Sequence, residues 1–203
     1  MVTGTIEELR LDSNLQLANH PKVLRLQLAA QRANHELIQL LMLYKYEIEK
    51  LTPNITENNL EDFLEEIAMD HRALAQAHGI TISVQCDPSL FAYFDENLLR
   101  NVISSSLGNA QRHTRDSIRL SAEQKEQFMV LRVEDNGDGF PDDMLAFQAA
   151  IDSLDSINQG RTQLGLYFAN LIARSHTNRT RKGFIRLENS VNLEGGCFSI
   201  WLP

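Results

Sequence analysis

The sequence predicts an α+β protein: a two-layer α/β sandwich, in which one mixed sheet carries helices on a single face, preceded by a long helix. Three observations support this prediction. Residues 22–51 contain neither glycine nor proline and have helical apolar spacing. From residue 53 onward, helical and strand-like segments follow one another in runs. The strand-like segments are short and end in glycine, proline or asparagine turns. We therefore expect a helical region at 1–52 and a sandwich domain at 53–203.

Residues 22–51 are expected to form one helix with a coiled-coil-like seam, after a short helix at 2–11 and a connection. Apolar side chains step along it by four and three, at Leu26, Ala30, Ala33, Leu37, Leu40, Tyr44 and Leu51. A single hairpin cannot bury so wide an apolar face, and a dimeric bundle is the economical solution. We therefore expect a homodimer through residues 22–51.

The sandwich domain is expected to contain ten elements. A helix begins near Leu60 and is ended by Gly79, and Asp95 is a good N-cap for the next helix. In chain order the expected elements are a helix from 60, strands at 80–85 and 90–94, a helix from 95 to about 113, strands at about 117–121 and 127–134, a short helix at 144–150, a helix at 164–175, and strands at 184–189 and 197–202.

Composition excludes several classes of partner. The chain has 203 residues, enough for a substantial core, and a net charge of −8 without a dense Lys/Arg block. Nucleic acid and anionic membranes are therefore not expected partners. Cys86 and Cys197 lie far apart without metal-site spacing, which favours a reducing, cytoplasmic location. No apolar run approaches membrane-spanning length and no signal peptide opens the sequence, so we expect a soluble chain.

The turn after the strand at 127–134 is the centre of the functional argument. Asp135 ends the strand, and Gly137 and Gly139 follow it. Glycine permits positive φ and a close approach of ligand to backbone, so the turn presents a carboxylate beside exposed N–H groups. A carboxylate there suits a planar heterocycle, because it accepts from an exocyclic amine. The same residues also form ordinary hairpin turns, so the motif by itself is weak evidence.

Three further motifs accompany this turn in a fixed order. They are Asn109-Ala110-x-Arg112-His113 before it, and Leu164-Gly165-Leu166 and Gly195-Gly196-x-Phe198 after it. Together the four motifs resemble the ATP-binding domain of sensor histidine kinases, a branch of the superfamily that includes gyrase, heat-shock chaperone and mismatch-repair ATPases. The resemblance covers about residues 55–203. It implies a histidine kinase ATPase-like sandwich preceded by a long-helix hairpin.

The resemblance implies ATP and Mg²⁺ as cofactors. Asn109 would offer a neutral oxygen to Mg²⁺, and Arg112 and His113 would reach the same phosphates. Asp135 would accept from the adenine amino group, and Gly165 would open a helix whose N–H groups meet phosphate. The implied ATP-binding residues are Asn109, Arg112, His113, Asp135, Gly137, Gly139, Thr162, Gly165 and Leu166. Taken one at a time, four of these residues fit a structural role as well as they fit a role in ATP binding: Asn109, Arg112, His113 and Gly165.

The chain departs from the family pattern at several positions. Ser105 stands where a second asparagine is common, and Gly196 stands where a threonine is common. Arg161-Thr162-Gln163 replaces the usual Gly-x-Gly before Leu164. Two main interpretations are therefore open: an ATP-binding kinase region, or a non-enzymatic dimeric scaffold with a degenerate nucleotide pocket that docks a signalling partner. A related ATPase of another branch fits less well, because the long helix has a dimerising seam.

The implied reaction is transfer of the ATP γ-phosphoryl to a histidine, for relay to the receiver domain of a response regulator. His35-Glu36 is similar to the acceptor pair, but residues 29–41 resemble the second hairpin helix, which does not carry the acceptor. We therefore expect the acceptor upstream of Met1, assign no catalytic residue, and expect this chain to bind ATP without autophosphorylating. It would be the cytoplasmic part of a larger sensor. His20, His71, His78 and His176 are expected to be ordinary surface histidines.

Overall fold

A computed structural model of the chain describes residues 52–147, 161–189 and 193–203, except the side chains of 147 and 161–163. Contacts divide the chain into two units, residues 1–51 and 52–203, and the described residues all belong to the second unit. The expected long helix at 22–51, its dimer seam and His35 lie outside the described residues. Within the described part, no helix is long and apolar enough to span a membrane.

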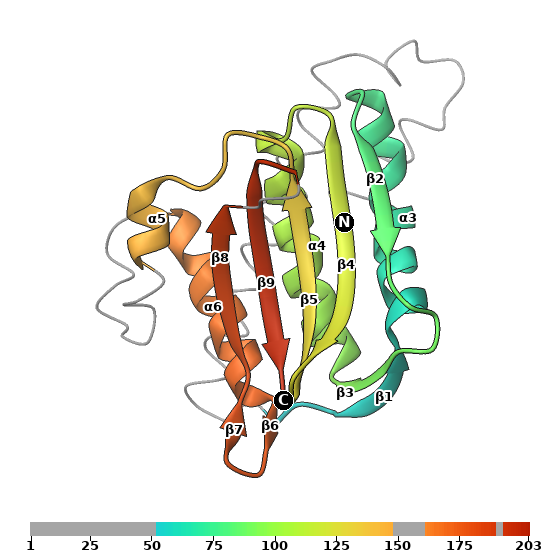
Figure 1. Ribbon diagram of the computed structural model, residues 1–203, viewed down its shortest axis with the longest axis vertical. Helices are drawn as coiled ribbons and strands as arrows, with labels where there is room; N and C mark the ends of the chain where they lie inside the picture. The colour runs from blue at the N-terminus through green and yellow to red at the C-terminus, as the bar shows by residue number, and fades with distance from the viewer. Residues whose placement is uncertain (1–51, 148–160, 190–192) are drawn as a thin grey trace, which may run out of the picture. The chain divides into compact units, whose positions relative to one another are not determined.

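The centre of the domain is a five-stranded sheet with the order β2-β4-β5-β9-β8 (Figure 1). β2 is parallel to β4, and the other neighbouring pairs are antiparallel, so the sheet is mixed as predicted. The strands are β2 Thr81–Gln85, β4 Ser117–Lys125, β5 Phe128–Asp135, β8 Phe184–Asn189 and β9 Gly196–Leu202.

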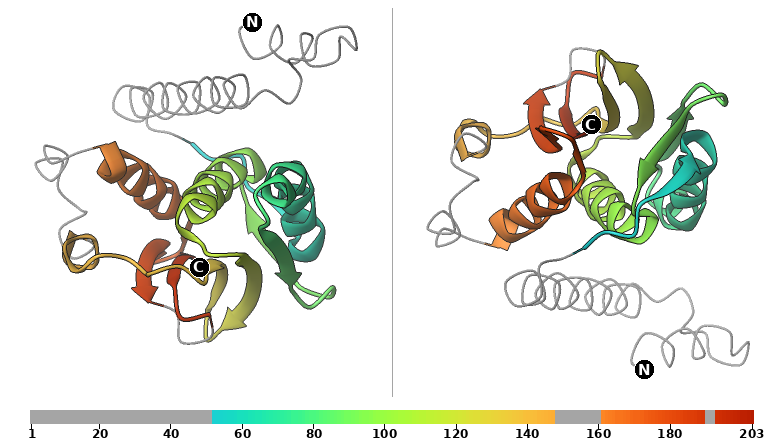
Figure 2. Two further views of the ribbon diagram at one scale, coloured as in Figure 1. Left: turned by 90° about the horizontal axis from the view of Figure 1, so that it is seen from above. Right: turned by 90° about the horizontal axis from the view of Figure 1, so that it is seen from below.

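Three long helices cover one face of the sheet and complete the two-layer sandwich. Figure 2 shows α4 between α3 and α6. They are α3 Leu60–Ala77, α4 Glu96–His113 and α6 Arg161–Ser175, and a short α5, Asp142–Phe147, lies apart from them. Alternate strand residues are apolar and fully buried, including Ile118, Leu120, Leu131 and Ile200. These residues form the core against the helices, because successive side chains of a strand point to opposite faces.

The other face of the sheet carries ion pairs between β4 and β5, beside an aromatic cluster of Phe128, Phe184 and Trp201. Arg119 on β4 donates to Glu134 on β5 at 2.6 Å, and the Glu134 side chain is only 5% exposed. Arg132 on β5 donates to Glu123 on β4 at 2.6 Å.

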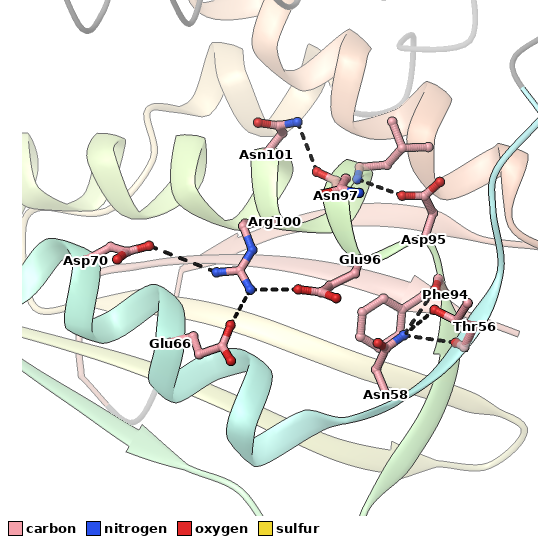
Figure 3. A network of polar contacts seen from close by, with 11 residues as sticks. Thr56, Asn58, Glu66, Asp70, Phe94, Asp95, Glu96, Asn97, Arg100 and Asn101 are labelled. Atoms are coloured by element: carbon pink, nitrogen blue, oxygen red, sulfur yellow. Dashed lines mark hydrogen bonds and ion pairs between the residues drawn. The ribbon is translucent and has the colours of Figure 1, made fainter. Parts of the chain in front are cut away.

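An arginine connects α3 to α4 on the surface of the helical layer (Figure 3). Arg100 of α4 donates to Glu66 of α3 at 2.5 Å and to Glu96 of its own helix at 2.8 Å. The Arg100 side chain is 27% exposed, so the pairs are partly shielded from solvent. The contacts keep α3 aligned with α4, whose far end carries three of the predicted site residues.

Three short strands were not expected from the sequence: β1 Thr56–Asn59, β6 Thr177–Asn178 and β7 Arg181–Lys182. β1 pairs antiparallel with the expected strand β3, Phe91–Phe94, and β6 pairs with β7. The β1 sequence, Thr-Glu-Asn-Asn, has no apolar alternation, because its side chains are largely exposed. The remaining expected elements are present, with ends that differ by a few residues.

His176 is not a surface histidine, contrary to the expectation. It is 2% exposed, its Nε2 accepts from the backbone N–H of Asp95 at 3.0 Å, and its Nδ1 donates to the Ile172 carbonyl at 2.7 Å. Desolvation lowers the pKa of this imidazole, against the smaller opposing effects of the Ile172 hydrogen bond and the Asp95 charge. His176 is buried because it joins the end of α6 to the start of α4.

Candidate functional site

One end of the sandwich brings together the motifs that the sequence analysis identified (Figure 1). β5 runs to this end and finishes at Asp135, while β9 begins there at Gly196. α4 finishes at the same end with His113, and α6 begins there. Residues far apart in the sequence therefore meet, because the strands and helices carrying them start or stop at the same edge.

Asp135 is buried, and its two carboxylate oxygens are in different environments. The residue is 7% exposed. Oδ1 accepts from the N–H of Gly137 at 2.8 Å and of Gly196 at 3.3 Å. Within the described residues, Oδ2 has no hydrogen-bond partner. A buried carboxylate oxygen without a partner is costly, so this atom is suited to a ligand that donates an N–H.

Gly196, the first residue of β9, lies close to that free oxygen. A Cβ added at Gly196 would lie 3.0 Å from Asp135 Oδ2 and 3.1 Å from the Phe140 ring. A Cβ at Gly195 would lie 2.2 Å from the Asp135 carbonyl oxygen, so no side chain fits there. Sequence reasoning did not assign a role to Gly195. Its signal was the Gly-Gly pair immediately before an apolar strand, but only the packing shows what the pair contacts.

The two glycines of the Asp135 turn are each required by a close neighbour. A Cβ at Gly137 would lie 2.1 Å from the carbonyl oxygen of His113, the last residue of α4. Gly139 has φ +80°, and a Cβ there would lie 2.7 Å from Oδ1 of Asn189. The same oxygen accepts from the N–H of Phe140 at 2.7 Å, which ties the turn to the end of β8. The turn is thus packed against both α4 and β8.

The end of α4 presents polar side chains to solvent. Asn109, Arg112 and His113 are all exposed, and Arg112 donates from Nη2 to Oδ1 of Asn109. Arg112 and His113 lie in the last turn, where cationic groups are favoured by the helix dipole. The N-terminal end of α4 is fixed by Asp95, whose Oδ1 accepts from the Leu98 N–H at 3.0 Å. The C-terminal end of α4 can meet an anion through the side chains of Arg112 and His113.

The described residues hold a divalent cation poorly on their own. They contain no group of three or more His, Cys, Asp or Glu side chains that could bind a metal ion. Asn109 contributes one neutral oxygen, which is already engaged by Arg112. Such a donor set fits Mg²⁺ only when phosphate oxygens and water supply most of the ligands.

The expectation that Gly165 opens a helix is wrong. α6 begins at Arg161, so Gly165 is its fifth residue, and the free N–H groups belong to residues 161–164. Leu166 is 9% exposed and contributes to the core. The side chain of Thr162 lies outside the described residues. α6 starts early because Arg161-Thr162-Gln163, unlike the glycines that the resemblance led us to expect, permits ordinary helical geometry.

The family of histidine kinase-, DNA gyrase B- and HSP90-like ATPases matches residues 94–203, which is more than half of the chain. The chain belongs to this family. The matched segment begins at the end of β3 and includes α4, the Asp135 turn, α6 and β9. The predicted resemblance to the ATP-binding domain of histidine kinases is therefore confirmed at the level of family and fold.

Solved structures of other members of this ATPase family have the same fold. Histidine kinase AdeS of Acinetobacter baumannii is 17% identical with TM-score 0.67, over 99% of this chain and 92% of that one. The nucleotide-free catalytic domain of histidine kinase ThkA is 21% identical with TM-score 0.60, over 74% and 95%. Full-length ShkA in complex with AMPPNP is 20% identical with TM-score 0.69, over 100% and 42%. No curated protein matches the chain significantly.

Proposed function

We propose that this chain is the ATP-binding catalytic region of a two-component sensor histidine kinase. Membership of the ATPase family and the likeness to histidine kinase folds support the proposal. The single observation that carries it is the environment of Asp135. A carboxylate that is 7% exposed has one oxygen bound by two backbone N–H groups, while its other oxygen has no partner among the described residues and lies beside Gly196.

In this proposal, Asp135 Oδ2 accepts a hydrogen bond from the amino group of adenine. Because Oδ1 is held by two N–H donors, the carboxylate cannot rotate without losing them, so Oδ2 is pre-oriented toward the ligand. A charge-assisted hydrogen bond in a water-excluded pocket is strong compared with one in water. Gly196 places no side chain beside Oδ2, where a Cβ would lie 3.0 Å from it, so the base can approach this oxygen.

The phosphates would lie at the exposed end of α4. Arg112 and His113 supply cationic or donor groups, and Asn109 supplies a neutral oxygen for Mg²⁺. Arg112 now donates to Asn109, so we expect it to exchange this contact for a phosphate oxygen and free the amide oxygen for the metal. When bound, Mg²⁺ would neutralise phosphate charge. The chain itself would contribute orientation and electrostatic stabilisation rather than covalent steps.

The proposed reaction is transfer of the γ-phosphoryl group to a histidine, followed by relay to the receiver domain of a response regulator. We place the acceptor histidine upstream of Met1 and propose dimerisation through residues 22–51 in the cytoplasm. The rival proposal is a dimeric scaffold that docks a signalling partner without using ATP. One observation favours the scaffold: α6 begins as ordinary helix at Arg161-Thr162-Gln163, without the glycine-rich segment expected to cover phosphates.

Titration of the purified chain with ATP, with and without Mg²⁺, tests the proposal directly. Asp135→Asn should weaken ATP binding by about 10- to 100-fold. The asparagine must keep its oxygen toward Gly137 and Gly196, so its NH₂ group faces the adenine NH₂ group and two donors oppose each other. Asp138→Asn is the matched control, because that side chain lies three residues away and is 97% exposed. If Asp135→Asn and the wild type bind ATP with equal affinity, adenine does not bind at this turn.

Incubation with labelled Mg-ATP tests the position of the acceptor. The chain should bind ATP but acquire no acid-labile, base-stable phosphate, because an acceptor nitrogen must lie in line with the γ-phosphate. A chain extended upstream by a few helical turns should gain this phosphate. Phosphate on the present chain that disappears in His35→Gln would overturn the placement. An extended chain that binds ATP and stays unphosphorylated would favour the scaffold.

A further inference from the structure

Asn136, the residue after Asp135, joins the turn to the connection between α4 and β4. Its Oδ1 lies 2.7 Å from the Thr114 hydroxyl. The same oxygen accepts from three consecutive backbone N–H groups, those of Arg115 at 3.2 Å, Asp116 at 3.2 Å and Ser117 at 3.1 Å. Convergence of three peptide N–H groups on one oxygen fixes the path of the chain as it leaves α4.

The nitrogen side of the same amide is also used. Asn136 Nδ2 donates to Oδ1 of Asp116 at 2.8 Å, and the backbone N–H of Asn136 donates to the Ser117 carbonyl at 3.2 Å. The orientation of the amide is therefore determined, because its oxygen faces only donors and its nitrogen faces a carboxylate. A side chain with an acceptor alone or a donor alone could not satisfy both sides.

The position of Asn136 gives this contact a functional meaning. Asp135 lies directly before it, and the residues that it holds directly follow His113 at the end of α4. The second point of contact between the turn and α4 is the approach of Gly137 to the His113 carbonyl. Asn136 thus connects the carboxylate proposed for the base with the helix end proposed for the phosphates.

We propose that Asn136 is a positioning residue that sets the distance between the base-binding and phosphate-binding halves of the site. The inference rests on the proposed function, since it assumes that Asp135 meets adenine and that α4 meets phosphate. ATP must engage both halves at once, whereas adenosine engages only the base half. A small shift between the halves therefore weakens the binding of ATP more than the binding of adenosine.

The first test compares the dissociation constants of ATP and adenosine for wild type and Asn136→Ala. We expect ATP affinity to fall about tenfold more than adenosine affinity in the variant. Asn101→Ala is the matched control, since Asn101 is an asparagine within α4, two turns before Asn109, and its side chain donates to the Asn97 carbonyl of the same helix at 2.9 Å rather than to the turn. This control should leave both affinities unchanged.

A rescue experiment separates positioning from loss of folding. Asn136→Asp places a carboxylate against Asp116, so the pair repels while the three N–H groups keep an acceptor. ATP affinity should fall. The double variant Asn136→Asp, Asp116→Asn restores a donor–acceptor pair in the reverse direction and should recover ATP affinity to within about threefold of wild type. Circular dichroism melts check that each variant is folded at the assay temperature.

The outcomes distinguish this inference from the proposed function. Wild type that binds both ligands, with a selective loss of ATP in Asn136→Ala and recovery in the double variant, supports the positioning role. Equal losses of ATP and adenosine, or no recovery in a folded double variant, overturn it while leaving the ATP site in place. Wild type that binds neither ligand refutes the proposed function, and the inference falls with it.

Discussion

Asp95 and Asp135 are two buried aspartates at opposite ends of the same sandwich, one before α4 and one after β5 (Figure 1). They are 9% and 7% exposed, so burial does not distinguish them. Asp95 uses both oxygens: Oδ1 accepts from the Leu98 N–H at 3.0 Å and Oδ2 from the Asn54 N–H at 2.8 Å. Asp135 uses Oδ1 alone among the described residues. The difference teaches that burial alone does not distinguish the two carboxylates, whereas hydrogen-bond saturation does: Asp95 is saturated, and Asp135 keeps one oxygen for the ligand that we propose.

The surroundings of the two aspartates follow the same division. Near Asp95 the buried His176 ties α4 to α6, and an open pocket of about 360 Å³ adjoins His176, lined by apolar side chains such as Phe91 and Phe128 and by polar ones such as Gln124. Near Asp135 the neighbours are glycines and exposed polar residues. The Asp95 end therefore contributes to stability, whereas the Asp135 end keeps atoms available for a ligand.

Substitution of the two aspartates should have opposite consequences, and this is the largest effect we expect. Asp95→Ala should lower the free energy of unfolding by about 2 kcal/mol, because α4 loses its N-cap and a buried N–H loses its acceptor. Its ATP affinity should stay near wild type in the folded fraction. Asp135→Asn should lose ATP affinity and keep its stability. Urea unfolding measures the free energy of unfolding, and calorimetric titration measures ATP affinity. A loss of stability in both variants would show that both aspartates are structural.

The glycine pair before β9 gives a finer version of the comparison. Gly196→Ala places a methyl group 3.0 Å from the free Asp135 Oδ2, and should reduce ATP affinity by about five- to tenfold with a small change in stability. Gly195→Ala meets the Asp135 backbone at 2.2 Å and should destabilise the fold by about 1–3 kcal/mol. Melting temperatures and ATP titrations should therefore rank the two variants in opposite orders. The same ranking in both assays would contradict this geometry.

Asn109→Ala tests the phosphate half of the site. With Mg²⁺, ATP affinity should fall about fivefold, toward the value without metal, because the chain loses its one neutral ligand for the cation. Without Mg²⁺, the affinity should change little. If ATP affinity falls by the same factor with and without Mg²⁺, Asn109 supports the helix end through its contact with Arg112 instead of binding the metal.

The pH dependence of stability should originate at the Asp95 end, and we expect this effect to be the smallest. Because desolvation lowers the pKa of His176 in the folded state, unfolding takes up a proton in mild acid. The free energy of unfolding should therefore fall as pH drops below about 6.5, the ordinary histidine value. His176→Gln should flatten the dependence of melting temperature on pH between 5.5 and 7.5. His78→Gln, at an exposed position, should leave it unchanged.

Local patterns determined much of the fold. The apolar spacing of α3 and α4, the short strand-like segments that end in turns, and the cap at Asp95 are properties of neighbouring residues, so they can be recognised without knowing what the segments pack against. The order of the motifs likewise indicated the family, which the match over residues 94–203 shows.

Tertiary structure decided the features that depend on distant partners. β1 is a strand only because β3 pairs with it, and its polar sequence gives no alternation to detect. His176 is buried because Asp95, 81 residues away in sequence, donates to it. The orientation of the Asp135 carboxylate, which leaves Oδ2 free, depends on the N–H of Gly196. The hydrogen bonds of Asn136 depend on the α4–β4 connection. Local periodicity cannot specify these, because hydrogen-bond saturation is a property of the assembled fold.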